Sequence, residues 1–303
     1  MYVIFGATGK VGSATVTALR QAGHAVRAVV RNKDEAKRFA AIGCESVVAD
    51  LRTPESVRSA IEGAQAIQML CPVPVGDSDP ESTMRRMIDV AAEALRAAPH
   101  ARVLALSDYG AELSHGTGIT LLFNYLETRL HSLGGRLTLL RSAEHMENWA
   151  RVIPIASQQG ILPSLHHPVT KPFPTVSARD VGLVAAELLL DKPRSDLARI
   201  VSVEGPQRIS ADYVAQVLGE AGNAKIAAIA VPRSEWTATL LRAGLTDKHA
   251  RLIAELFDAH NAGKIDVEET AKTERRFGKT TLPEVIASLL AAGGRIHSPI
   301  VQA

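Results

Sequence analysis

The first 141 residues alternate short β-branched runs with amphipathic stretches, and this alternation constrains the fold more than any other feature of the chain. The apolar runs are YVIF (2–5), AVRAVV (25–30), ESVVA (45–49), AIQML (66–70), RVLALS (102–107) and LTLLR (137–141). Strands that alternate with helices are typical of βαβ units and a parallel sheet. Six such strands predict an α/β fold with a doubly wound, Rossmann-like parallel sheet.

The stretches between these runs carry signals for the start and end of helices. NKDEAKRFAAIG starts at Asn32, a residue type that favours the N-cap, and stops at Gly43. In TPESVRSAIEG, Thr53 stands at the N-cap position and Pro54 at the first helical position. Both stretches are therefore predicted to be helices.

The regular alternation fades after Arg141. The segment 158–176 holds four of the fifteen prolines and is typical of a loop that crosses between two parts of a protein. Beyond it we expect helices over 177–191 and 210–222 and strands over 198–205 and 225–231. We predict a dinucleotide-binding domain over residues 1–150 and a smaller C-terminal α/β lobe over 151–303, with some chain crossing between them.

The charge of the chain is nearly balanced, with 34 basic and 32 acidic residues and a formal net charge of +2. No direct contact with nucleic acid is indicated. Cys44 and Cys71 lie in apolar surroundings without metal-ligand spacing, which indicates buried thiols in a reducing compartment. No apolar run is long enough to span a bilayer, so we expect a cytoplasmic protein, either a monomer or a homodimer.

Three glycines follow the first predicted strand, in VIFGATGKVGSA (3–14). Gly6, Gly9 and Gly12 would permit a tight turn, a close approach of the backbone to a pyrophosphate, and tight packing of helix on strand. For a lone triplet, a turn with a helix start and no ligand is the alternative interpretation. The preceding strand and the following βαβ pattern favour a dinucleotide site.

The residues after the second and third predicted strands indicate which dinucleotide binds. An acidic residue at the first position accepts hydrogen bonds from the adenosine ribose, whereas an arginine pairs with a 2′-phosphate. Here Arg31 and Asn32 occupy it, which favours NADP(H) over NAD(H), although Arg31 could also be a solvated residue at a helix start. Asp50 and Leu51 could hold the adenine, and Asp50 could equally be a turn residue. The backbone at Leu70, Cys71 and Pro72 should pass beside the cofactor.

Five segments together resemble one family: GATGKVG (6–12), VVRN (29–32), VVADL (47–51), LLRSAEHMENW (139–149) and SARDVG (177–182). The chain is similar to the NmrA-like atypical short-chain dehydrogenases, which include dinucleotide-sensing co-regulators as well as quinone and dye reductases. The resemblance implies a pyrophosphate loop formed by Gly6, Thr8, Gly9, Lys10, Val11 and Gly12, and a 2′-phosphate position at Arg31 and Asn32. It also implies that Arg141 and Ser142 lie near the nicotinamide.

The residues expected to do chemistry depart from the usual short-chain dehydrogenase pattern of a tyrosine four residues before a lysine. Tyr125 has this spacing to Arg129, and an arginine does not reproduce a lysine bonded to ribose. Tyr125 is therefore either the catalytic residue or a tyrosine at the core edge. Ser107 ends the fifth predicted strand at the cofactor edge, and Tyr109 follows it into the expected substrate pocket.

An electron-poor acceptor such as a quinone or a dye does not need the missing lysine, because delocalisation stabilises its reduced form. We expect His145, Trp149 and Phe173 to line the pocket for such a small molecule. The adjacent His166 and His167 lack clustered Cys, Asp or Glu partners in the sequence, so no metal site is predicted. The sequence therefore predicts an NADP(H)-dependent oxidoreductase. The alternative is a non-catalytic protein that senses NADP(H) and acts through a protein partner.

Overall fold

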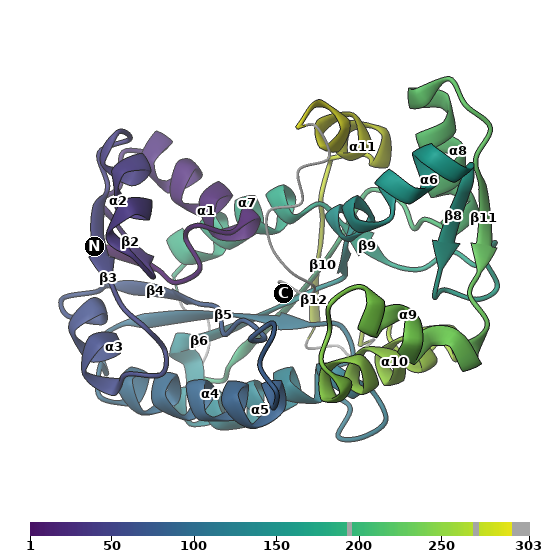
Figure 1. The fold of residues 1–303 in the computed structure, drawn as a ribbon. Helices are drawn as coiled ribbons and strands as arrows, with labels where there is room; N and C mark the ends of the chain where they lie inside the picture. Colours follow the sequence, from purple (N-terminus) through teal and green to yellow (C-terminus); the bar gives the residue numbers. More distant parts are fainter. Residues whose placement is uncertain (193–195, 269–272, 293–303) are drawn as a thin grey trace.

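The computed structural model describes residues 1–192, 196–268 and 273–292 (Figure 1). These residues form an eight-stranded sheet in the order β12-β10-β6-β5-β4-β1-β2-β3, in which all neighbours are parallel. The strands are β1 (Tyr2–Ile4), β2 (Val26–Val30), β3 (Glu45–Val48), β4 (Ala66–Met69), β5 (Arg102–Asp108), β6 (Leu137–Ser142), β10 (Arg199–Glu204) and β12 (Thr273–Phe277). The predicted doubly wound parallel sheet is confirmed.

Helices cover both faces of this sheet (Figure 1). One face carries α1 (Lys10–Gln21), α2 (Lys33–Ala40) and α7 (Ala178–Leu190), and the other carries α3 (Pro54–Ile61), α4 (Pro80–Arg96) and α5 (Leu121–Leu130). Each layer encloses its own apolar core, with Leu19 and Leu189 on the first side and Ile88 and Leu126 on the second. Burial of these side chains, at roughly 25 cal/mol per Å² of apolar surface, holds the layers together.

The six strands predicted before residue 142 all appear within one residue of their expected bounds. Asn32 caps α2, because its side-chain oxygen accepts a hydrogen bond from the backbone N–H of Glu35 at 3.1 Å. Thr53 precedes α3 as expected but makes no side-chain capping bond. From β1 the sheet continues to β2 and β3 on one side, and from β4 it continues to β5 and β6 on the other side. Such a reversal of strand order opens a crevice at the carboxyl ends of the strands.

Residues beyond 142 also build a second region beside the sheet (Figure 1). Its elements are β7 (Glu144–His145), β9 (Thr175–Val176), α6 (Ile153–Gln159), β8 (Ile161–Ser164), α8 (Ala211–Gly222), β11 (Ala227–Ala230), α9 (Trp236–Arg242), α10 (Asp247–Asn261) and α11 (Leu282–Ala291). A third apolar cluster joins α6, α8 and α11. The sheet itself takes in β10 and β12 from the later half of the chain, and the division at residue 150 stays a prediction.

No helix in the described parts of the chain is long and apolar enough to cross a membrane.

The closest helix contact on the sheet lies between α1 and α7. Thr15 on α1 donates hydrogen bonds to the carbonyls of Val11 and Gly182, both at 3.1 Å. A Cβ atom on Gly182 would overlap the Val11 carbonyl oxygen and lie 2.6 Å from the Cβ of Ala14. The absence of a side chain at Gly182 therefore sets the position of α1, the helix that begins at the glycine turn.

We expect Gly182→Ala to lower the free energy of unfolding by about 1–3 kcal/mol, because the added methyl group must push two backbones apart. Gly222→Ala is the matched control, since no atom lies within 4 Å of a Cβ at this helical position. That control should leave the stability unchanged or raise it by up to about 1 kcal/mol. Denaturant unfolding of both variants checks this, and equal stabilities would contradict the packing argument.

Candidate active site

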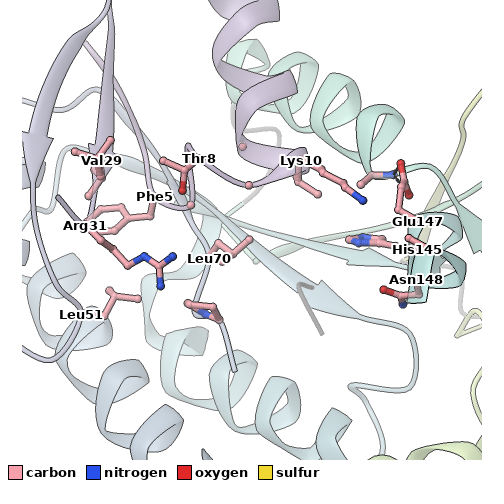
Figure 2. Close-up of a pocket in the computed structure, with 18 of the residues that line it drawn as sticks. Phe5, Thr8, Lys10, Val29, Arg31, Leu51, Leu70, His145, Glu147 and Asn148 are labelled. Carbon is pink, nitrogen blue, oxygen red and sulfur yellow. Dashed lines mark hydrogen bonds between the residues drawn. The ribbon is translucent and has the colours of Figure 1, made fainter. Parts of the chain in front are cut away.

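A cavity of about 380 Å³ opens at the carboxyl ends of β1, β2 and β4. Figure 2 shows Arg31 at one end, the glycine turn with Thr8 and Lys10 in the middle, and His145, Glu147 and Asn148 at the other end. The predicted site residues that line it are Gly6, Thr8, Gly9, Lys10, Val11, Gly12, Arg31, Asp50, Leu51, Leu70, Pro72 and His145. Residues from several separate segments of the sequence therefore meet around one elongated space.

The glycine turn has the geometry that an anion site requires. Gly6 has a φ of 72°, in the region that favours glycine, and the N–H of Gly9 donates to the Gly6 carbonyl at 3.0 Å. A Cβ on Gly12 would overlap the same carbonyl, so only glycine fits there. The N-terminus of α1 carries no acidic residue in its first turn and no side-chain cap. Its backbone N–H groups thus remain available to a phosphate.

Arg31 supplies the positive charge at the far end of this cavity, where its side chain projects inward (Figure 2). Among the described residues, its guanidinium has no carboxylate partner. Asn32 does not line the cavity, because its side chain caps α2. Asp50 both lines the cavity and holds the local turn, since its carboxylate accepts a hydrogen bond from the N–H of Arg52 at 2.8 Å.

The side chain of Cys71 points away from this cavity into the apolar core. The residue is buried, and burial raises the pKa of its thiol to about 12. Only the neighbouring Leu70 and Pro72 contribute to the lining. The thiol of Cys71 is therefore neutral and contacts apolar side chains.

The short segment after β6 forms the other end of the cavity. Glu147 holds it against α7, because its carboxylate accepts hydrogen bonds from the Ser177 hydroxyl at 3.1 Å and from the N–H of Ala178 at 3.0 Å. This contact fixes the backbone that presents His145 and Asn148 to the cavity. The side chain of Glu147 is thus occupied by the N-terminus of α7, a favourable place for a carboxylate.

A second cavity of about 250 Å³ adjoins the first and shares His145, Asn148 and Arg151 with it. Its walls are largely apolar and come from the segment 142–152, β8, α9 and α10. Ser142 and Trp149 line this space, and the Trp149 indole N–H is buried without a partner in the described structure. A flat aromatic molecule would fit such walls, with Trp149 and a few polar groups to orient it.

Arg151 lines both cavities, and no motif in the sequence indicates it. Burial lowers the pKa of its guanidinium to about 10, and no carboxylate of the described chain forms an ion pair with it. It nevertheless stays cationic at neutral pH. A partly buried cation without a paired anion is suited to hold negative charge on a bound molecule.

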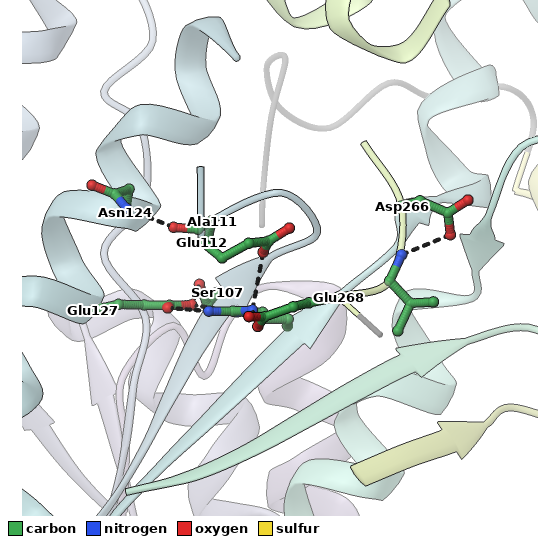
Figure 3. A network of polar contacts seen from close by, with 9 residues as sticks. Ser107, Ala111, Glu112, Asn124, Glu127, Asp266 and Glu268 are labelled. Atoms are coloured by element: carbon green, nitrogen blue, oxygen red, sulfur yellow. Dashed lines mark hydrogen bonds and ion pairs between the residues drawn. The ribbon is translucent and has the colours of Figure 1, made fainter. Parts of the chain in front are cut away.

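A buried cluster of charges around Arg141 lines neither cavity, and Figure 3 shows its carboxylates Glu112, Glu127 and Glu268. Arg141 donates to Glu127 at 2.7 and 2.9 Å and to Glu112 at 3.0 Å, and it also pairs with Glu268. Burial alone would lower the pKa of Arg141, but these carboxylates outweigh it and raise the pKa. Ser107 belongs to the same cluster, because its hydroxyl donates to Glu127 at 2.6 Å.

Two predicted tyrosines lie outside both cavities. The Tyr125 hydroxyl donates to the Asp89 carboxylate at 2.8 Å, and Arg129 pairs with the same carboxylate at 2.7 Å. Neither residue lines the cofactor cavity or its neighbour. Tyr109 is buried in the core beneath α7 and likewise lines neither space. The geometry gives no support to a catalytic Tyr125 or to a pocket role for Tyr109.

His166 does have the partners that its sequence neighbourhood lacks. Its Nε2 lies 3.0 Å from the Glu144 carboxylate, and His260 lies beside it with ring centroids 5.4 Å apart. Phe173 stacks on the other face of His166 at 3.6 Å and therefore stands behind the second cavity. The expectation that no acidic side chain clusters with these histidines is wrong, because the fold brings together residues that are distant in sequence.

Comparisons with known proteins support a nucleotide site at the first cavity. A family profile described as NAD(P)H-binding matches residues 6–131. The NAD(P)H azoreductase of Xenophilus azovorans is 22% identical over 258 residues, which cover 85% of this chain and 86% of the azoreductase. The NADPH complex of the quinone oxidoreductase QOR2 from Escherichia coli aligns with a TM-score of 0.79 at 20% identity, over 96% of this chain and 100% of that one. The Citrobacter sp. triphenylmethane reductase aligns with a TM-score of 0.78 at 20% identity, over 96% and 99%.

Residues 6–131 match an NAD(P)H-binding family, and the chain shares the fold of the quinone oxidoreductase, the triphenylmethane reductase and NmrA. The resemblance that the motifs indicated is confirmed by this agreement. The profile ends at residue 131, before the segment 142–152 and before most of the residues that line the second cavity.

Asp108 lines the second cavity, and its protonation should couple stability to pH. Burial raises the pKa of this carboxyl to about 7, although Thr120 donates a hydrogen bond to it at 2.8 Å. The folded state thus keeps a proton that the unfolded chain loses near its ordinary pKa of about 4. The corresponding stability is present at low pH and is lost as the pH rises through 7.

We therefore expect Asp108→Asn to gain about 1–3 kcal/mol of stability relative to the wild type between pH 5 and pH 8. Denaturant unfolding of both proteins at both pH values measures this change. Contributions from other titrating groups cancel when the stability of the wild type is subtracted from that of the variant. Thr120→Val, which removes the hydrogen bond to Asp108 without removing the carboxyl group, is the control. A difference between Asp108→Asn and the wild type that does not change with pH would contradict a raised pKa.

Proposed function

We propose that this protein is an NADP(H)-dependent reductase that passes a hydride to a small, flat, electron-poor acceptor such as a quinone or a dye. The observation that carries the proposal is that the two cavities have His145, Asn148 and Arg151 in common in their walls. The names of the azoreductase, the quinone oxidoreductase and the triphenylmethane reductase support the same class of reaction. The cytoplasmic location and the monomeric or homodimeric state stay predictions.

The first cavity fits an extended dinucleotide in one direction. Its pyrophosphate would lie at the N-terminus of α1, and the adenosine would lie toward Leu51 with its 2′-phosphate against Arg31. The nicotinamide would then lie at the end formed by His145 and Asn148, beside the second cavity. A bound nicotinamide supplies the hydride, and the protein positions the acceptor against it.

Arg151 has the clearest chemical task in this arrangement. Hydride addition to a quinone leaves negative charge on an oxygen, and the unpaired guanidinium at the junction of the cavities would stabilise that charge. No tyrosine lines either cavity in the described part of the chain, which fits an acceptor whose reduced form is stabilised by delocalisation. No proton donor on α5 is then required.

Purified protein should oxidise NADPH in the presence of a quinone or an azo dye, measured by the loss of NADPH absorbance. Arg151→Gln should lower kcat by roughly 10- to 100-fold, because it removes the charge that the reduced acceptor needs. Arg242→Gln, on the exposed end of α9, is the control and should leave kcat unchanged. NADPH binding without oxidation of any acceptor would contradict the reductase and favour the sensing protein.

Arg31 should decide between the two dinucleotides. We expect Arg31→Ala to weaken NADPH binding by roughly 10- to 100-fold and NADH binding by less than about 2-fold, because only NADPH carries the 2′-phosphate. Lys37→Ala, on the exposed face of α2, is the matched control for a change in surface charge. Titrations of both cofactors followed by fluorescence measure this, and equal losses for both would contradict a 2′-phosphate site at Arg31.

A further inference from the structure

Three side chains in the wall of the second cavity form a group with the composition of a metal site. Glu144 lies on β7, His166 follows β8, and His260 lies on α10. One ligand atom of each lies within 4.8 Å of the other two. Both histidines are buried, with 4% and 8% of their surface exposed. The fold thus brings two imidazoles and one carboxylate together from segments that are far apart in sequence.

The chemistry of the group suits a divalent transition metal rather than a hard cation. Two imidazole nitrogens and one carboxylate oxygen are a common ligand set for Zn²⁺, which leaves a fourth position open. His260 can offer a ring nitrogen to such a cation. Its Nδ1 is buried and has no hydrogen-bond partner in the described structure.

The charges around the group are close to what a bound cation needs. The Glu144 carboxylate supplies the negative charge of the group, and one of its oxygens lies 3.0 Å from the Nε2 of His166. Asp108 and Glu144 interact electrostatically, whereas Arg151 and Lys171 place positive charge near Glu144 and His260. A cation would be attracted by the carboxylates and repelled by Arg151.

We propose that Glu144, His166 and His260 bind one divalent cation of the Zn²⁺ class. The cation lies between His166 and Glu144 in place of their present hydrogen bond, and its fourth position faces the cavity. Binding forms bonds from the metal to two ring nitrogens and one carboxylate oxygen. The hydrogen bond between His166 and Glu144 breaks, and the water molecules that the three side chains replace on the ion leave to solvent.

The test uses the untagged, metal-stripped full chain, titrated with Zn²⁺ by calorimetry and with Co²⁺ by visible absorption. We expect one ion per chain for both metals. Glu144→Gln and His260→Gln should each weaken binding by at least roughly 10-fold. His167→Gln, which changes the neighbouring exposed histidine, is the control and should bind as the wild type does.

Arg151→Gln provides a change in the opposite direction, because loss of its positive charge should tighten binding of both ions by roughly 3- to 10-fold. This variant keeps the proposal testable even if a ligand variant fails to fold. No stoichiometric binding by the wild type would overturn the proposal. Binding that is the same in the wild type, His260→Gln and Arg151→Gln would place the ion elsewhere and would overturn it too. These titrations contain neither NADPH nor an acceptor, so their outcome is separate from that of the reductase proposal.

Discussion

The site depends on how closely helix α1 approaches the turn that precedes it. The Gly6 carbonyl lies so near Gly12 that no side chain fits between them, and Gly182 lets α7 press on the other side of α1. Thr15 joins the two helices by a hydrogen bond to the Gly182 carbonyl. These contacts fix the direction of α1 and with it the direction of the N–H groups that would hold a pyrophosphate. The remaining site residues are placed relative to this helix end.

The arginines that line the cavities differ from Arg141 in whether they are paired with carboxylates. Arg141 forms ion pairs with three carboxylates and lines neither cavity. Arg31 and Arg151, in contrast, have no carboxylate partner in the described structure and face the cavities. A buried ion pair contributes little net stability, whereas a partly buried cation without a pair, such as Arg151, costs stability unless a ligand meets it. Arg31 is exposed, so water hydrates its charge until a ligand binds. This contrast separates structural arginines from those that we expect to contact bound molecules.

Much of the fold and of the dinucleotide half of the site could be predicted from the sequence, because both depend on local patterns. Six strands, the glycine turn and the cap at Asn32 are all set by residues close together in the chain. The acceptor half could not be predicted in this way. Glu144, His166 and His260 meet only after β7, β8 and α10 are packed.

Two predicted roles failed to find support because spacing on one helix does not reveal what the neighbouring elements offer. Tyr125 has the correct separation from Arg129, yet both side chains contact Asp89 on α4. Ser107 lies at the carboxyl end of β5, as expected, yet its hydroxyl donates a hydrogen bond to the Glu127 carboxylate. Arg151 belongs to no sequence motif, and it is recognised only because it lines both cavities in the structure. Functional side chains in such a site are thus defined by their partners in space.

The central claim is that one dinucleotide spans the first cavity and presents its nicotinamide to the second. A crystal structure of the protein with NADP(H) bound tests it most directly. We expect the 2′-phosphate within about 4 Å of the Arg31 guanidinium and the nicotinamide ring between His145 and Asn148, with one face open to the second cavity. A 2′-phosphate in solvent, or a nicotinamide turned away from the second cavity, would contradict this account.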